Sequence, residues 1–164
     1  MHIDLKAELK RNPVAIAGMA ALGTMAILAL TAPLITSHDP LEQTPLAFEA
    51  PSSSHWMGTN HVGQDLWAQL VYGARTSLLV GFVSAIVSTI LAAIMGTSAA
   101  LVGGVHDRIV MRLVDGLIIV PMIILVILLA AYLEPGIWTL ILLLSFFGWP
   151  WGARVIRAQT LSLK

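Results

Sequence analysis

The sequence contains no cysteine among its 164 residues. Disulfide bonds, cysteine-ligated zinc, iron–sulfur clusters and thiol catalysis are therefore excluded. Charged side chains are also scarce: they make up 11% of the chain, whereas a soluble domain carries about 25%. Because so few charges cannot cover a surface that faces water, most of the surface must face an apolar medium.

An excess of positive charge is also absent, since the formal net charge is zero. Nucleic acid is not expected as a partner, because phosphate binding requires a basic excess. Every lysine follows a leucine rather than the glycine that a P-loop requires. The sequence also lacks Gly-x-Ser-x-Gly and His-Glu-x-x-His motifs and any acidic pair within an apolar run. We therefore expect neither enzymatic activity nor a cofactor.

Long hydrophobic runs are abundant, and the first covers residues 13–36 without a charged side chain. Asn12-Pro13 predicts an N-cap followed by proline at the first helical position. A helix of this length measures about 36 Å and can cross a hydrocarbon core of about 30 Å. Since a secretory signal has an apolar core of only about 7–15 residues, we predict a retained first transmembrane helix.

Three further apolar runs predict transmembrane helices at residues 76–102, 117–133 and 137–152. Pro121 is expected to bend the helix 117–133, because proline leaves a backbone carbonyl without its helical partner. The polar residues 103–108 predict a tight turn. These patterns indicate one all-α, polytopic membrane protein with four transmembrane helices.

Small residues recur along one face of the run 76–102, at steps of three or four positions. Helices associate in a bilayer through close approach of their backbones, which small side chains permit. We therefore expect this face to pack against another helix, although alanine and glycine are also simply common in membrane spans. The face comprises Gly81, Ala85, Ser88, Ala92, Gly96 and Ala100.

Residues 37–75 form a polar segment rich in turn-forming residues. Its last part, 62–75, has apolar residues at helical spacing and predicts a short amphipathic helix at the membrane interface. His38, His55 and His61 could in principle bind a transition metal. Their spacings match no local metal motif, and loop histidines are usually solvated, so we predict no metal site.

The lysines and arginines predict the orientation of the chain in the membrane. With four spans, eight of the nine fall on one side, together with both termini and the turn 103–108. Only Arg75 falls on the other side. Because positive loops remain in the cytoplasm, residues 1–12 and the carboxyl end are predicted to be cytoplasmic and residues 37–75 external. The first eleven residues would form either a surface helix, with Leu5 and Leu9 facing the membrane, or a solvated tail.

Arg112 and Asp115 lie three positions apart, near the start of the predicted helix 117–133. Residues at this spacing are neighbours on a helix and can pair. The favoured interpretation is an interfacial ion pair that ends the span, and the alternative is a gate or a contact with a cytoplasmic partner.

Several stretches of the chain resemble one family, in the same order as in that family. They are similar to the C-type permease subunit of bacterial ABC importers for dipeptides, oligopeptides and nickel. Asn60 and Gln64 stand where the family has aspartate and arginine, so an ion pair through these positions is unavailable. The stretches are Arg11-Asn12-Pro13, Ala32-Pro33-Leu34-Ile35, His38-Asp39-Pro40, His55-Trp56-Met57-Gly58-Thr59-Asn60-His61-Val62-Gly63-Gln64-Asp65, Leu70-Val71-Tyr72-Gly73-Ala74-Arg75-Thr76-Ser77-Leu78, Met111-Arg112-Leu113-Val114-Asp115 with Pro121, and Trp149-x-x-x-x-Arg154-x-x-Arg157-Ala158-Gln159-Thr160-Leu161-Ser162-Leu163-Lys164.

The resemblance implies a permease of the six-helix type I importer fold that passes peptide or nickel across the cytoplasmic membrane by alternating access. Its implied partners are a second permease subunit, two cytoplasmic ATPases that hydrolyse ATP, and an external solute-binding protein that meets residues 37–75. The small-residue face and Pro121 would line or flank the pathway, and Arg112, Asp115, Arg154 and Arg157 would lie on the cytoplasmic side.

The family's ATPase-coupling loop would begin shortly beyond Lys164 and would be followed by two more spans. The resemblance therefore implies a permease that is truncated or split before this loop. The alternative hypothesis is a membrane remnant or assembly fragment that transports nothing.

Overall fold

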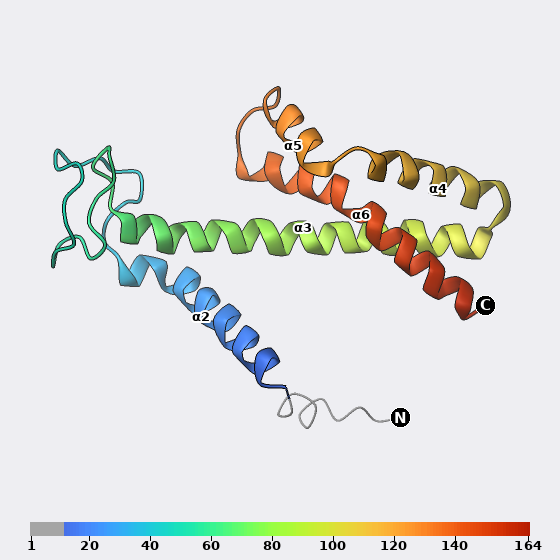
Figure 1. Cartoon of the computed structure of the whole chain (residues 1–164), viewed down its shortest axis with the longest axis horizontal. Coiled ribbons are helices and arrows are strands. Elements are labelled where there is room, and N and C mark those ends of the chain that lie inside the picture. The colour runs from blue at the N-terminus through green and yellow to red at the C-terminus, as the bar shows by residue number, and fades with distance from the viewer. Residues whose placement is uncertain (1–11) are drawn as a thin grey trace. The chain divides into compact units, whose positions relative to one another are not determined.

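The computed structural model describes residues 12–164, and most of these residues are helical (Figure 1). The predicted choice between a surface helix and a solvated tail concerns residues 1–11, which lie outside the described residues. The chain divides into two compact units, one ending at Leu78 and the other covering Leu79–Lys164. Each unit is described by itself below.

Helix α2, Pro13–Ile35, begins as its sequence predicts. The side chain of Asn12 accepts a hydrogen bond from the backbone N–H of Ala15 at 3.2 Å, and Pro13 occupies the first turn. These two features satisfy or remove N–H groups that would otherwise lack partners at the start of the helix. The helix ends where Thr36 adopts an extended conformation. Residues 36–65 then form a series of turns, and the term polar segment refers to these residues from here on, because α3 includes the rest of the range 37–75.

Helix α3, Leu66–Val102, has 37 residues and no break between residues 75 and 76. The prediction of a separate interfacial helix at 62–75 is therefore wrong. Residues 62–65 belong to a turn, and no proline interrupts the helix after it begins. A helix of this length measures about 56 Å, which exceeds a hydrocarbon core of about 30 Å. Part of α3 must therefore extend beyond the hydrocarbon.

Where the sequence predicts one helix 117–133 bent at Pro121, the structure has two helices. Helix α4, Gly104–Ile119, and helix α5, Met122–Ala130, meet at an angle of 78°. Val120 is extended, with φ −83° and ψ 128°. The ring of Pro121 disfavours the helical conformation in the residue before it and offers no N–H. The predicted turn 103–108 likewise shrinks to Gly103, because α4 begins at Gly104.

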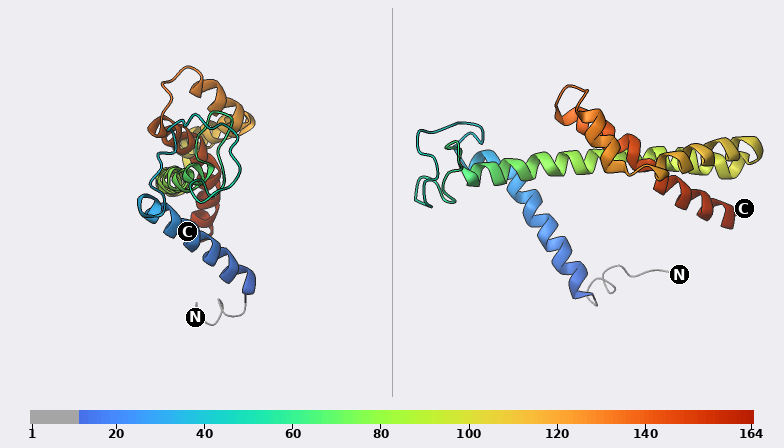
Figure 2. Two further views of the ribbon diagram at one scale, coloured as in Figure 1. Left: turned by 90° about the vertical axis from the view of Figure 1, so that its left-hand side faces the viewer. Right: turned by 45° about the horizontal axis from the view of Figure 1, so that its top comes forward.

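Helix α6, Ile137–Ser162, continues ten residues beyond the predicted end at 152. Within the second unit, α4 and α6 pack beside α3, and α5 packs against α6 (Figure 2). The buried centre of this unit combines one residue of α3, one of α4 and two of α6, namely Ala92, Val114, Trp149 and Ala153.

Three of the described helices, α2, α3 and α6, are long and apolar enough to cross a membrane, and the bent pair α4–α5 would be a fourth span. Their large apolar side chains remain uncovered: Leu30 is 81% exposed on α2 and Ile123 69% exposed on α5. Apolar surface on this scale is not stable in water and indicates contact with lipid or with further protein. The structure thus supports an all-helical membrane protein with three or four spans.

Candidate functional site

Asp65 joins two parts of the polar segment at the start of α3. Its Oδ1 accepts a hydrogen bond from the backbone N–H of Ala68 at 2.7 Å, which caps α3. Its Oδ2 lies 2.7 Å from Nδ1 of His55. Burial raises the pKa of the Asp65 carboxyl, but the hydrogen bonds from Ala68 and His55 and the nearby His38 outweigh it, so the pKa lies below its ordinary value. The carboxylate form of Asp65 is therefore favoured.

Thr59 connects this turn to the loop that precedes it. Its Oγ1 donates to the carbonyl of Leu46 at 2.5 Å and accepts from the backbone N–H of Glu49 at 2.9 Å. The backbone N–H of Leu66 donates to the carbonyl of Gly58 at 3.1 Å. Thr59 is buried, so these hydrogen bonds are shielded from water. They hold the loop to the start of α3.

Gly58 and Gly63 are required by the geometry of this turn. Their φ angles are +73° and +80°, a region that favours glycine. A Cβ atom on Gly58 would overlap the carbonyl oxygen of Glu49, and one on Gly63 would overlap that of Thr44. The glycines of the predicted motif therefore allow the backbone of the turn to approach the loop 44–50.

Asn60 and Gln64, where the sequence departs from the family pattern, form a neutral pair. The Asn60 side-chain amide donates to Oε1 of Gln64 at 2.9 Å. Oδ1 of Asn60 also accepts from the backbone N–H groups of Val62 and Gln64, each at 3.0 Å. Two amides thus provide a direct contact at the two positions where the resemblance predicted opposite charges in the family.

The remaining residues of the predicted external motif lie on α3, outside this turn. Tyr72 is partly buried, whereas Gly73 and Arg75 are exposed. A Cβ on Gly73 would meet nothing within 4 Å. The turn thus brings together Gly58, Thr59, Gly63 and Asp65, and leaves the other three residues apart.

In the second unit, part of the small-residue face of α3 lies against α6. A Cβ on Gly96 would lie 2.5 Å from the carbonyl oxygen of Ala153, and one on Gly152 would lie 2.8 Å from Cβ of Ala92. A Cβ on Gly148 would lie 3.3 Å from Cβ of Ser88. The backbones of α3 and α6 therefore approach closely where both helices carry small residues.

The amino-terminal part of the same face differs. Gly81 and Ala85 are exposed, and a Cβ on Gly81 would meet nothing within 4 Å. Pro121, also predicted to be near the pathway, is exposed at the break between α4 and α5.

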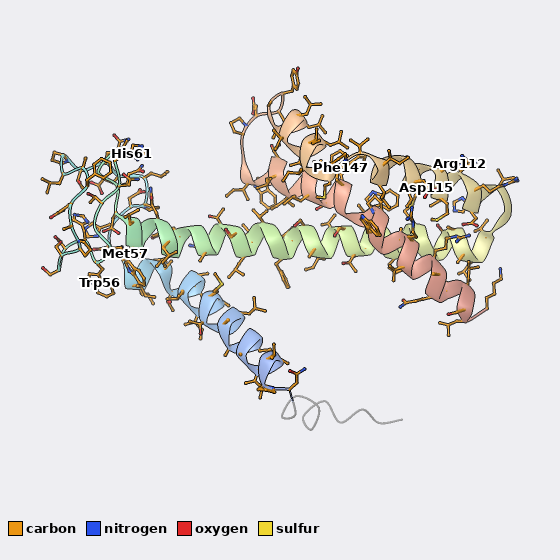
Figure 3. All side chains as sticks on the ribbon, in the orientation of Figure 1. Trp56, Met57, His61, Arg112, Asp115 and Phe147 are labelled. Atoms are coloured by element: carbon orange, nitrogen blue, oxygen red, sulfur yellow. The ribbon has the colours of Figure 1, made fainter. Side chains whose placement is uncertain are left out.

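Two arginines of α6 form ion pairs with aspartates of α4. The Arg157 guanidinium donates to both carboxylate oxygens of Asp107 at 2.5 Å, and Arg154 donates to Asp115 at 2.6 Å. Figure 3 shows Asp115 and Arg112 on α4. The expected pair of Arg112 with Asp115 is therefore wrong, because Asp115 binds an arginine of another helix. Arg112 is exposed.

Asp107 was missed by the sequence analysis, although it makes the bidentate contact. It lies 50 positions from Arg157, so no local spacing relates the two residues. The available signal for Asp107 was the polar character of residues 103–108, which was interpreted only as a turn.

His55 was also misjudged, because the sequence analysis expected a solvated side chain and the residue is 7% exposed.

Part of the chain matches a protein-family model. Residues 5–51 match the family model described as the N-terminal TM domain of oligopeptide transport permease C. This stretch covers α2 and the first part of the polar segment.

Curated relatives match almost the whole chain. The dipeptide transport system permease protein DppC of Bacillus subtilis is 35% identical over 162 residues, which are 98% of this chain and 51% of that protein. The oligopeptide transport system permease protein OppC of the same organism is 33% identical over 98% of this chain and 53% of its own length. OppC of Mycobacterium tuberculosis H37Rv is 39% identical over 94% and 54%.

The apolar helices and these relatives define a multi-pass protein of the inner membrane. The resemblance predicted from the sequence is confirmed: the chain is related to the amino-terminal part of C-type peptide permeases of ABC importers. The chain spans about half the length of the curated relatives it matches. These relatives are named as transport components, which agrees with the expectation that the chain is not an enzyme.

Proposed function

We propose that the chain is part of a permease subunit that passes peptides across the cytoplasmic membrane by alternating access. The observation that carries this proposal is 33–39% identity to named dipeptide and oligopeptide permeases over nearly all of the chain. Peptide is favoured over nickel because these relatives are named for peptides.

The contact between α3 and α6 supports alternating access. Where Gly96 lies against Ala153, and Ala92 against Gly152, the helices meet through small side chains with little interlocking. Such surfaces can slide without removing large side chains from holes in the partner helix. The break at Pro121 adds a position at which α4 and α5 can change their angle. These features are the elements of the proposed pathway wall.

The proposed orientation places both ends of the chain in the cytoplasm and residues 37–75 outside. It rests on eight of nine basic residues falling on one side if the bent pair α4–α5 crosses as one span. Two of these arginines, Arg154 and Arg157, are paired with aspartates. The exposed Arg108 and Arg112 remain available for a cytoplasmic partner.

The partners we propose are those of a binding-protein-dependent importer. A second permease subunit would cover apolar faces such as that of α5, and two ATPases in the cytoplasm would supply the energy. An external solute-binding protein would dock on the polar segment, whose turn is held rigid by Thr59 and Asp65.

Uptake by cells tests the transport proposal. The gene is deleted, and uptake of radiolabelled dipeptide, oligopeptide and nickel is measured before and after the gene is restored. We expect loss of peptide uptake and unchanged nickel uptake. Restoration with Gly96→Leu should fail, whereas restoration with Gly81→Ala should succeed. Peptide uptake that persists unchanged in the deletion strain would contradict the proposal and favour a remnant that transports nothing.

The orientation has a separate test, made simple by the absence of cysteine. Gln43→Cys and Leu163→Cys are both at exposed positions. In intact spheroplasts, a membrane-impermeant maleimide should label the cysteine at 43 at once and the cysteine at 163 only after the membrane is permeabilised. The opposite pattern would overturn the proposed orientation without bearing on the relationship to permeases.

A further inference from the structure

The polar segment brings together three side chains that are far apart in the sequence. His38 follows α2, His55 lies in the middle of the segment, and Asp65 caps α3. Their ligand atoms all lie within 4.8 Å of one another. Oδ2 of Asp65 is 2.7 Å from Nδ1 of His55 and 3.9 Å from Nδ1 of His38. The two imidazole rings, with centroids 5.0 Å apart, thus face one carboxylate oxygen.

The cluster is buried, so a cation held there must be compensated by the carboxylate of Asp65 and by the ring nitrogens. His55 is 7% exposed and Asp65 is 4% exposed, so water is largely excluded. Nδ1 of His55 and Oδ2 of Asp65 lie 2.7 Å apart, and two facing lone pairs at this distance would repel each other. Either a proton on Nδ1, which makes a hydrogen bond to Asp65, or a metal ion bound by both atoms must therefore lie between them.

Glu49 provides the second observation that points to a metal. Its Oε2 is buried without a hydrogen-bond partner among the described residues, 3.7 Å from Nε2 of His55. Metal-bound histidines almost always donate their other ring N–H to a carboxylate or carbonyl. A metal ion would replace the Nδ1 proton that His55 donates to Asp65, and the ring proton would then lie on Nε2, on the side of Glu49.

A pocket adjoins the cluster and gives it room. Its volume is about 190 Å³, and its lining includes His38, Asp65 and Trp67. Nε1 of Trp67 is likewise buried without a hydrogen-bond partner among the described residues. The pocket can hold water molecules that complete the coordination of an ion and can serve as its route of entry.

The donor atoms determine the class of ion. Two imidazoles and one carboxylate suit Zn²⁺, Ni²⁺ or Cu²⁺, whereas Mg²⁺ and Ca²⁺ prefer oxygen ligands. Tetrahedral ligands at Zn–N distances of about 2.0–2.1 Å lie about 3.3 Å apart. The separations from Oδ2 of Asp65, 2.7 Å to His55 and 3.9 Å to His38, bracket this value, and all three ligand atoms lie within 4.8 Å of one another. The side chains must therefore shift to close the site around an ion.

We propose that His38, His55 and Asp65 bind one divalent transition-metal ion, for which Zn²⁺ is the reference, with Glu49 orienting His55. The ion connects the end of α2, the middle of the segment and the start of α3. Such a link stabilises the folded segment, because the unfolded chain offers no preformed site. This inference is independent of transport and does not require that the metal be cargo.

The test uses the whole chain, purified in detergent without a histidine tag and freed of metal with a chelator. Zn²⁺ alone is titrated by calorimetry, and Co²⁺ is titrated as a coloured substitute. We expect one ion per chain and visible Co²⁺ bands typical of a tetrahedral site. Absence of stoichiometric Zn²⁺ binding would overturn the proposal.

Matched variants distinguish the cluster from adventitious binding. His38→Gln should weaken Zn²⁺ binding by more than 100-fold, since a ligand matters more than an orienting residue, whose loss costs about 10–100-fold. This variant is expected to fold, because the ring of His38 makes no hydrogen bond within residues 12–164 and is 41% exposed. The control is His61→Gln, an exposed histidine outside the cluster (Figure 3).

The site is supported if His61→Gln keeps the Zn²⁺ affinity of the unmodified chain and His38→Gln loses it. Equal affinity of the two variants, or equal losses in both, would overturn it. As a second measurement, Zn²⁺ should slow chymotrypsin cleavage after the exposed Phe48 in the unmodified chain but not in His38→Gln. The same protection in both proteins would also count against the proposal.

Discussion

Residues 36–65 and the paired helices α3 and α6 are held together by opposite means. The polar segment has no regular helix, and it depends on side chains such as Thr59 and Asp65 that bond to distant backbone groups. The helices supply their own backbone bonds and meet through Gly96, Ala153 and neighbouring small residues. Lipid offers no hydrophobic drive for helix association, so close backbone contact replaces it.

Glycine illustrates the difference. Gly63 is needed because its φ is +80° and because the carbonyl of Thr44 approaches it. Gly96 is in ordinary helical conformation and is needed only because α6 lies so close. The same residue thus provides backbone freedom in one region and free space in the other. The two regions should therefore respond differently to added side chains.

The largest effect is expected from Gly96→Leu. The new Cβ would lie 2.5 Å from the carbonyl oxygen and 3.2 Å from Cα of Ala153. Backbone atoms cannot move aside as a flexible side chain can, so α3 and α6 must separate. Overpacking of this kind costs about 3 kcal/mol or more. The measurement is the unfolding free energy in mixed detergent micelles.

Gly81→Leu is the matched control on the same helix. Nothing lies within 4 Å of a Cβ at Gly81, so the change in unfolding free energy should stay within about 0.5 kcal/mol. If both leucines were equally harmful, the contact between α3 and α6 would not be what makes Gly96 important.

The second prediction concerns the polar segment. Gly63→Ala forces a Cβ into left-handed backbone, which costs about 1–2 kcal/mol, and also drives it into the carbonyl of Thr44. We expect faster chymotrypsin cleavage after Phe48 and a total loss of about 2–3 kcal/mol. Gly103→Ala meets nothing within 4 Å and so has no overlap contribution, although its φ of +67° and ψ of −159° lie in a region that is essentially restricted to glycine. Unchanged cleavage after Phe48 in Gly63→Ala would show that the turn does not approach the loop closely.

The sequence predicted well what depends on neighbours along the chain. Asn12 and Pro13 begin α2 as expected, because capping is a contact over three positions. The small-residue spacing also indicated a face that can meet another helix. The spacing could not show that only the part from Ser88 onward lies against α6, because that depends on where the partner helix crosses.

What the sequence could not predict are contacts between distant residues. His55 and Asp65 lie ten positions apart in a segment without helical or strand period, and Asp107 and Arg157 lie 50 positions apart. No repeating pattern relates such pairs, since turns determine the distances between them. The break at Val120 was expected only as a bend, because how far a proline bends a helix depends on the packing of its two sides.

The third prediction compares the two ion pairs of the second unit. Arg157→Ala should lower the unfolding temperature more than Arg154→Ala. The Arg157–Asp107 pair is bidentate, with side chains 29% and 20% exposed, whereas those of Arg154 and Asp115 are 45% and 54% exposed. Exposed pairs contribute little because water and salt screen them. The melting temperatures are compared at low and high salt, and a larger effect from Arg154→Ala would contradict this ranking.

The smallest effect is expected at the neutral pair of the polar segment. In Asn60→Asp, the two backbone bonds to Oδ1 are kept, but the bond from the amide to Oε1 of Gln64 is lost. A carboxylate then faces a carbonyl oxygen that also accepts from Gln69 at 2.7 Å, so the amide of Gln64 cannot turn over without losing that bond. The single variant should lose about 1 kcal/mol, the net value of one hydrogen bond.

The double variant Asn60→Asp/Gln64→Arg replaces the neutral contact with the charged pair of the family pattern. If the two residues act as one unit, Gln64→Arg alone should also destabilise the segment, and the double variant should regain about 1 kcal/mol relative to the sum of the single changes. Chymotrypsin protection of Phe48 measures this coupling. Additive losses would show that Asn60 and Gln64 contribute independently to stability. The contact between these two positions would then have no energetic consequence of its own. Regained stability would show instead that the polar segment keeps this contact when its two amides are replaced by two charges. The contact between α3 and α6 does not permit such a replacement, because its backbones lie too close together.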